Sequence, residues 1–452
     1  MSDGRTIRKM MLALSALLLA IVTAACGGGT QEETAGDGAS SNASAEATAE
    51  GEAAAGEEAA KEPVEITFLS LITPNLTEEF WDEWIGYFEA QNPDIKVKRI
   101  QAPSLEGLND NYAKTLLASG DFPDVLSNIS YQDFAKAGAL MEIPIDDDIK
   151  KIKDYESLAI DGKLYTLQAY LQPHTQIFYN KDLFAKAGID TLPKSWDEFE
   201  AVAERLKAAG ITPLLTGGDW MTTLTFSILT GPEIFGKNPK WYADRNAGAV
   251  SYQDENWIGV AGRYQRLAEK GYFNEGALSI GYTQVEQEFL KGNGAMYPMG
   301  SWFTAAYAAA QPDFEVGVFA PPTLDGSGPY MSGSRGTSFA VSNTTKHAEA
   351  ALKFAKFLVL DPEFHKAFSK SDGMFSGLVE PINYEFTPLQ QEIFDLLQEA
   401  GTMTGYEAQR AGDFPVNGLP NQLTKVGQNL LLKGSDLQKE MASLDEYWDK
   451  NK

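Results

Sequence analysis

The chain has 452 residues, of which 43% are hydrophobic and 11% aromatic, a composition that supports sizeable cores and is far from disordered. It contains 37 Lys and Arg against 63 Asp and Glu, a formal net charge of −26. A surface this acidic repels phosphates, so we expect no nucleic-acid partner. One Cys excludes a disulfide framework, and with three His residues we expect no metal site and no cofactor.

Residues 1–25 have the pattern of a signal peptide. Arg5, Arg8 and Lys9 precede an unbroken run of apolar and small residues at positions 10–22. As a helix, this run would span about 20 Å, which is short of the roughly 30 Å hydrocarbon core of a membrane. The length therefore favours a signal peptide over a membrane-spanning helix.

The single Cys, Cys26, follows directly. Residues 22–26 (VTAAC) resemble the bacterial lipoprotein box, in which the Cys is lipidated and becomes the mature N-terminus, although Thr23 stands where that pattern usually has Leu. The resemblance implies a Cys26 anchored to the cell membrane by two acyl chains. The alternative is an ordinary signal peptide with a Cys near its end.

Residues 27–63 contain no aromatic residue, Leu, Ile or Val, and they carry nine acidic residues and one Lys. Such a segment cannot bury enough surface to offset its own ordering entropy. We therefore expect residues 26–63 to form a lipidated Cys followed by an acidic, disordered tether. A helical Ala/Glu spacer is the alternative, weakened by the interspersed Gly and Ser.

The first elements of the globular part alternate between strands and helices. Alternating, β-rich residues predict strands at 64–69, 95–100 and 125–126. A helix capped by Thr77 and stopped by Pro93 follows the first strand, and a helix over 112–119 that ends at Gly120 follows the second. This order predicts an α/β fold with a mainly parallel sheet.

Further amphipathic helices are predicted at 195–209, 256–270, 346–360 and 389–400. Ser195 with Glu198 has the spacing of a capping box, and Asn180 or Asp182 fits a helix cap. Trp81 and Trp84 have apolar partners at helical spacing, which predicts core packing. Because roughly 390 folded residues exceed what one core supports, we expect two lobes.

Motifs for covalent chemistry are missing from the chain. It contains no G-x-S-x-G, H-E-x-x-H, G-x-x-x-x-G-K-[ST] or G-x-G-x-x-G. The acidic run at 146–148 lacks the ligand spacing of a calcium loop and reads as a solvated loop. A glycosidase needs only two carboxylates, and 63 acidic residues always offer such pairs, so their presence indicates nothing.

A series of short motifs resembles one family, the family 1 extracellular solute-binding proteins of ATP-driven (ABC) importers, to which the maltodextrin-binding protein belongs. The motifs occur in order between about residues 64 and 368. They are GDFPDV at 120–125, FYNKDLF at 178–184 with AGI at 187–189, KSWDEF at 194–199, AM at 295–296 with GSW at 300–302, and VSN at 341–343.

The resemblance implies a two-lobed periplasmic-binding-protein-like α/β fold with a ligand cleft between lobes joined by crossing segments. It implies a first lobe of residues 64–172 plus 337–375 and a second lobe of 173–336 plus 376–452. We expect an extracytoplasmic, membrane-anchored monomer that captures a carbohydrate, in particular an oligosaccharide, by hinge closure. It would deliver this ligand unaltered to the membrane subunits of an ABC importer, and so would not be an enzyme.

A sugar site needs flat aromatic faces and planar polar side chains on loops at strand ends. Asp219 and Trp220 follow a Gly-Gly loop signal, and Trp302 matches a stacking aromatic of the family. Core burial is the alternative for both Trp residues, and a structural role is the alternative for His174. The other candidates, from strand ends and crossing segments, are Ser70, Asn128, Ser130, Tyr131, Tyr170, Gln172, His174, Ser334, Arg335 and Phe375.

Two other functions stay open at this point. A cell-surface glycosidase or lyase could use a carboxylate pair that the sequence does not reveal. A binder of a non-sugar solute, such as an oligopeptide, a polyamine or a metal ion, would share the fold. The neutral polar and aromatic candidate set favours a sugar over a non-sugar solute, whereas only a test for turnover separates a sugar binder from an enzyme that processes sugars.

Overall fold

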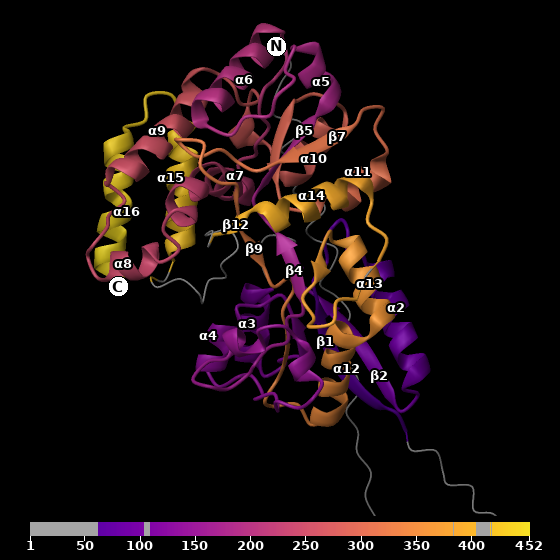
Figure 1. Cartoon of the computed structure of the whole chain (residues 1–452). Helices are drawn as coiled ribbons and strands as arrows, with labels where there is room; N and C mark the ends of the chain where they lie inside the picture. Colours follow the sequence, from indigo (N-terminus) through magenta and orange to yellow (C-terminus); the bar gives the residue numbers. More distant parts are fainter. Residues whose placement is uncertain (1–61, 104–108, 383, 404–415, 417) are drawn as a thin grey trace, which may run out of the picture. The chain divides into compact units, whose positions relative to one another are not determined.

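The computed structural model describes residues 62–103, 109–382, 384–403, 416 and 418–452 (Figure 1). The predicted signal peptide, Cys26 and the tether up to residue 61 lie outside the described residues. None of the helices in the described ranges has the length and apolar content needed to cross a membrane.

The first sheet has the predicted parallel core. β1 (Val64–Ser70) pairs in parallel with β2 (Ile95–Gln101) and with β3 (Val125–Ser127), and β10 (Phe339–Val341) adds antiparallel to β3, in the order β10-β3-β1-β2. The mainly parallel sheet expected from the βαβαβ pattern is confirmed.

Helices cover both faces of this sheet. Figure 1 shows α2 (Glu78–Gln91) and α12 (Ala348–Leu360) beside β1 and β2. The Thr77 side chain accepts a hydrogen bond from the Phe80 N–H, and Gly120 ends α3 (Asp110–Ser119) with a φ of 84°, so both predicted helix ends are confirmed. The remaining helices of this part are α4 (Tyr131–Lys136) and α13 (Pro362–Ser371).

Alternation along β1 divides the first core between the two faces. Phe68 packs on one face with Trp81, at 5.2 Å between ring centroids, while Leu69 joins a smaller cluster on the other. Trp81 is fully buried and donates its indole N–H to the Leu71 carbonyl, 2.7 Å away. The core position expected for Trp81 is confirmed, and Trp84 packs against the same cluster.

The second sheet differs from the first because it is antiparallel. Its central strand β5 (Gln176–Asn180) pairs with β6 (Met296–Met299) and β7 (Val316–Phe319), both antiparallel. Asn180 caps α5 (Lys181–Lys186), and Ser195 with Glu198 forms the predicted capping box of α6 (Trp196–Ala208). The β-α-β rhythm of the first lobe therefore does not extend to this sheet.

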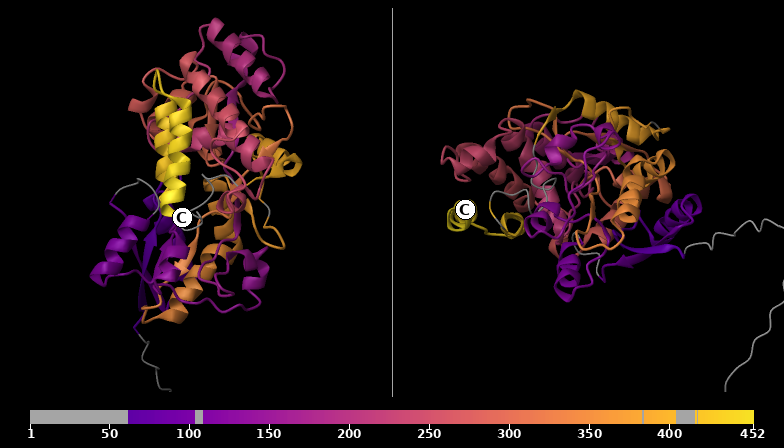
Figure 2. Two further views of the ribbon diagram at one scale, coloured as in Figure 1. Left: turned by 90° about the vertical axis from the view of Figure 1, so that its left-hand side faces the viewer. Right: turned by 90° about the horizontal axis from the view of Figure 1, so that it is seen from below.

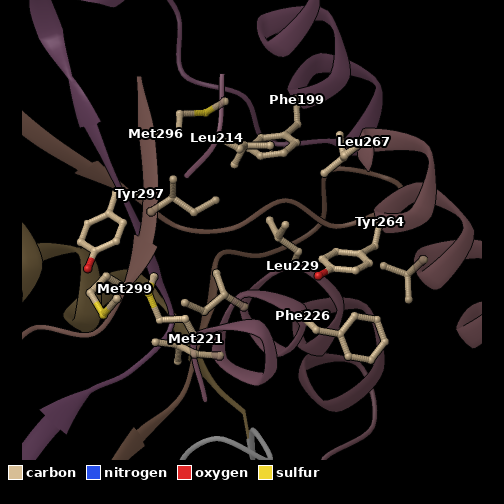
Figure 3. Packing of buried hydrophobic residues seen from close by; sticks show 14 of the residues in the cluster. Phe199, Leu214, Met221, Phe226, Leu229, Tyr264, Leu267, Met296, Tyr297 and Met299 are labelled. Carbon is tan, nitrogen blue, oxygen red and sulfur yellow. The ribbon is translucent and has the colours of Figure 1, made fainter. Parts of the chain in front are cut away.

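A single large core underlies the second sheet and its helices. In Figure 3, the Phe199 ring lies between Leu214 and Leu267, while Met221 lies beside Met299. The helices around this core are α7 (Trp220–Gly231), α8 (Trp241–Asn246), α9 (Glu255–Glu269), α10 (Tyr282–Leu290), α11 (Phe303–Ala310), α14 (Pro388–Glu399), α15 (Leu419–Leu430) and α16 (Leu437–Asn451). The last two run side by side (Figure 2).

A third, small sheet connects these parts of the chain. β4 (Tyr170–Pro173) pairs with β9 (Gly333–Ser334) on one side and with β11 (Phe375–Ser376) on the other, all antiparallel. β8 (Tyr330–Met331) pairs with β12 (Gly401–Thr402). Three chain segments thus pass through one small sheet, as expected for crossing segments; the lobe boundaries at 172, 336 and 375 stay predictions.

A buried histidine, His365, lies next to this sheet. His365 is fully buried, stacks on Tyr170 at 4.4 Å, and its Nδ1 bonds the Val359 carbonyl 2.9 Å away, while no partner of its Nε2 is found among the described residues. Burial lowers the pKa of His365 to about 4. The proton therefore prefers the unfolded chain, where the pKa is about 6.5.

We predict that stability falls as the pH drops from about 6.5 towards 4, because protonation of His365 favours unfolding in that window. The loss from this one group reaches about 3 kcal/mol at the acid end. Urea unfolding at pH 7.5 and pH 5 would measure it. His365→Phe should shrink the difference between the two pH values, whereas the exposed His347→Gln should leave it unchanged; an equal acid loss in His365→Phe would contradict the assignment.

Candidate ligand-binding site

Four aromatic rings lie close together between residues 174 and 302. We call them the aromatic group; they are His174, Trp220, Tyr282 and Trp302. Trp302 lies 5.3 Å from the His174 ring and 6.2 Å from the Trp220 ring, and Trp220 lies 5.1 Å from Tyr282. Trp220 is 41% exposed, whereas Trp302 is partly buried. The predicted Trp220, Trp302 and His174 are therefore brought together, and core burial does not describe Trp220.

The turn between β6 and α11 positions Trp302. A Cβ on Gly300 would lie 1.9 Å from the indole ring of Trp302, so only glycine lets the ring fold back over its own backbone. The Ser301 N–H donates to the Pro173 carbonyl at 2.9 Å, which ties this turn to the end of β4. Trp302 and His174 are thus held next to each other by backbone contacts.

Trp220 does not lie in a loop, as the Gly-Gly signal suggested, but is the first residue of α7. Asp219 is the helix cap: its Oδ1 accepts from the Met221 N–H at 3.0 Å, and its Oδ2 accepts from the Tyr282 N–H at 2.7 Å. The Asp219 carboxylate therefore holds the starts of α7 and α10 together. Its contacts are those of a positioning residue.

A buried carboxyl, that of Glu286, accepts a hydrogen bond from the Tyr282 hydroxyl. The Tyr282 hydroxyl donates to Glu286 Oε2 at 2.9 Å, and Glu286 is only 4% exposed. Burial raises the pKa of Glu286 to about 7. This contact fixes the Tyr282 ring against Trp220. The sequence analysis missed Tyr282 and Glu286 because both lie on a helix rather than at a strand end.

The small connecting sheet supplies the polar neighbours of Trp302. His174 Nε2 lies 3.0 Å from the Ser334 hydroxyl, and Gln172 Nε2 donates to Asp372 Oδ2 at 2.9 Å. Asn75 Nδ2 donates to the Trp302 carbonyl at 3.0 Å and also bonds the Asp372 carboxyl. Asn75 and Asp372 were missed; Asn75 follows the first strand, so the strand-end rule applied to Ser70 could have found it.

The first-lobe candidates line the carboxyl edge of the first sheet. Asn109 Nδ2 joins the ends of two strands by donating to the Ser70 and Ser127 carbonyls. Ser70 and Ser130 are fully buried, and the Ser130 hydroxyl donates to Asp110 Oδ2 at 2.6 Å. Asn128 is partly buried in a left-handed conformation (φ 53°), and Tyr131 is 6% exposed.

Three candidates have other surroundings, and we correct the expectation for them. Tyr170 is 2% exposed and donates its hydroxyl to the Leu358 carbonyl, and Phe375 is 3% exposed and packs 5.1 Å from Phe386. Both belong to cores because their strands turn them inward. Arg335 bonds the Lys153 carbonyl, so its guanidinium is already engaged there. We leave these three out of the site proposed below.

A search of the described residues for metal-binding clusters and cavities gives two results. In the described ranges, no group of three or more His, Cys, Asp and Glu side chains is placed to hold a metal ion. A cavity of about 260 Å³ lies in the second part of the chain, between Phe273, Asn274, Leu278 and Leu431, and it is lined by none of the predicted residues. The aromatic group with its polar neighbours is therefore the candidate site.

Comparison with known proteins identifies the class. The family model "Bacterial extracellular solute-binding protein" matches residues 73–363, more than half of the chain, so the protein belongs to this family. The family expected from the motif series is confirmed. Members of this family are described as extracellular solute-binding proteins.

Two curated relatives and one solved structure show what the chain is similar to. The "Multiple sugar-binding protein" of Streptococcus mutans is 26% identical over 319 residues, covering 68% of this chain and 74% of its own length. The "Maltooligosaccharide ABC transporter solute-binding lipoprotein" of Streptococcus pneumoniae is 26% identical over 276 residues, 56% of this chain and 60% of its own. The structure "SBP RafE in complex with raffinose" has a TM-score of 0.69 and 24% identity over 86% of this chain and 99% of its own, which confirms the two-lobed α/β fold.

Proposed function

We propose that the protein captures an oligosaccharide outside the cytoplasm and hands it, unaltered, to the membrane subunits of an ABC importer. The observation that carries this proposal is the pair of neighbouring Trp rings, one of them 41% exposed, with amide, hydroxyl and carboxyl groups beside them. Flat aromatic faces pack on the C–H faces of sugars, and planar polar groups match hydroxyls. The names of the two streptococcal relatives support the same ligand class.

The proposed mechanism is hinge closure about the small sheet of β4, β9 and β11. A saccharide that touches the aromatic group and the polar edge of the first sheet, near Asn128, would bind a closed state better than an open one. Such a ligand shifts the population towards closure without any covalent step. The importer would then recognise the closed protein.

A thermal-shift screen followed by calorimetry tests the function. The panel is raffinose, stachyose, maltotetraose, xylotetraose and chitotetraose, and at least one should raise the melting temperature through preferential binding to the folded state. Chromatography of the recovered sugar should show it intact. A shortened sugar would favour the rival glycosidase or lyase, and the absence of any shift across the panel would contradict oligosaccharide binding.

We also propose that Cys26 carries the lipid anchor. We predict that Cys26→Ser, expressed with its native leader in a bacterial host, moves the protein from the membrane fraction to the medium or periplasm, because the acylated sulfur is lost. Fractionation followed by immunoblotting measures this. Ser40→Ala is the matched control and should stay with the membrane; retention of Cys26→Ser on the membrane would exclude the lipid as the anchor.

A further inference from the structure

Asp372 stands where the contacts of three segments converge. It follows α13 directly, it accepts from Gln172 of β4, and it bonds Asn75, which also holds the Trp302 backbone. Gln172 Nε2 additionally donates to the backbone carbonyl of Asp372 at 3.1 Å, so the amide grips the residue at two atoms. Two side-chain amides thus fix the orientation of one carboxyl group beside the aromatic group.

These amides do not exhaust what the carboxyl can accept. An ionised carboxylate offers about four acceptor positions, and the side chains of Gln172 and Asn75 take two of them. Residue 372 as a whole is partly exposed, while burial of its carboxyl raises the pKa of that group. Sugar hydroxyls are donors of the kind that the remaining positions bind best, since hydrogen bonds to charged acceptors are the strong ones.

We propose, building on the oligosaccharide-binding function above, that the Asp372 carboxylate accepts hydrogen bonds directly from the hydroxyls of an uncharged saccharide, with Gln172 and Asn75 as its positioning residues. The contacts of Asn75 place this acceptor beside the backbone of Trp302, so one sugar ring can stack on the indole and donate to the carboxylate. Asp372 was not among the candidate site residues predicted from the sequence.

The charges around the site explain why the saccharide should be uncharged. Within the part of the chain that the structure describes, no ion pair joins Asp219, Glu286 or Asp372 to a cationic side chain. Burial raises the pKa of Tyr282, and the Glu286 and Asp372 carboxyls raise it further. A sugar carboxylate would meet these like charges without a compensating cation and would be repelled.

Burial of the Asp372 carboxyl predicts that saccharide binding depends on pH. Burial raises the pKa of Asp372 to about 6, while the amide bonds favour its ionised form. Below this value the group gains a proton and loses acceptor capacity, so binding should weaken with falling pH. Asp372 acts on the titratable Tyr282 of α10, which is bonded in turn by Glu286 of α10 and by Asp219 at the start of α7, and His174 lies beside Trp302. A variant that removes only Asp372 separates its contribution from theirs.

The test uses the purified protein and the panel sugar that binds it best. Asp372→Asn should weaken binding about tenfold or more in calorimetry at pH 7.5, since it removes a charged acceptor but keeps the shape of the side chain. Wild-type Kd should rise about tenfold between pH 7.5 and pH 5.0, and this rise should be much smaller in Asp372→Asn. Asp395→Asn, which removes an exposed carboxyl on α14, is the control and should match the wild type throughout.

The possible results distinguish failure of the proposed function from failure of the role of Asp372. If no sugar on the panel binds the wild type, the proposed function fails and this inference falls with it. If the wild type binds but Asp372→Asn, shown folded by circular dichroism, binds within twofold and keeps the same pH profile, the function stands and the role of Asp372 is wrong. Trigalacturonate supplies a further readout: it should bind the wild type more weakly than the neutral sugar, and equal affinity would contradict the selection against charge.

Discussion

Replacing Trp302 by alanine should weaken saccharide binding about 30-fold or more and leave the fold intact. A stacked aromatic at the centre of a binding site contributes about 2 kcal/mol or more, and each 1.4 kcal/mol is a factor of ten. Trp302 contacts both His174 and Trp220, so its removal also leaves the neighbouring rings without their central partner. Calorimetry with the best panel sugar measures the loss, and circular dichroism checks the fold.

Companion variants make this result specific. Trp302→Phe should recover part of the affinity because it restores a flat apolar face, and Trp220→Ala should weaken binding as well. Tyr87→Ala, which removes an exposed aromatic on α2, should behave like the wild type. Unchanged affinity in both Trp302→Ala and Trp220→Ala would show that the site lies elsewhere.

Replacing Asp445 by alanine should destabilise the protein by about 3 kcal/mol, at the lower end of what breaking a buried ion pair costs. Asp445 lies on α16 and accepts from Arg245 Nε of α8 at 3.0 Å, from the Tyr252 N–H at 3.0 Å and from the Ser251 hydroxyl at 2.7 Å. Its removal leaves a buried guanidinium, which is 7% exposed, with only its second partner Asp449.

The contrast with Asp449 tests the physical reason. Asp449 is 56% exposed, so Asp449→Ala should cost less than about 1 kcal/mol, as surface ion pairs do. Urea unfolding of the two variants and the wild type measures both. Equal losses in the two variants would contradict the view that burial of Asp445 decides its contribution. Saccharide binding should survive in both, because α16 lies away from the aromatic group.

Local signals along the chain predicted the first lobe well. Alternation at 64–69 and 95–100, the Thr77 cap and Gly120 each act within a few residues, and each is found in the structure. The second sheet was harder, since β5 pairs with β6, more than a hundred residues away, and the pairing direction leaves no local mark. The length of the folded part predicted two lobes, and family resemblance rather than periodicity supplied the way in which crossing segments join them.

The candidate site also contains some residues that the sequence predicted correctly and others that it did not. Trp220 was identified because it follows a Gly-Gly loop signal, Trp302 because it matches a family motif, and His174 because the resemblance places it in a crossing segment. The structure brings the three together. Tyr170 and Phe375 carry similar sequence surroundings but turn into cores, where the strand direction and not the residue type decides exposure.

By itself, the sequence determined the alternation of strands and helices, their caps and the family motifs, since all of these depend on residue types at short spacing. It also determined the acidic net charge, which depends on composition alone. Only the tertiary structure decided that Asn75, Gln172 and Asp372 meet beside Trp302, and that Glu286 supports Tyr282. These residues come from segments as far as 297 positions apart, and such contacts depend on how helices and sheets pack, which no short stretch of sequence encodes.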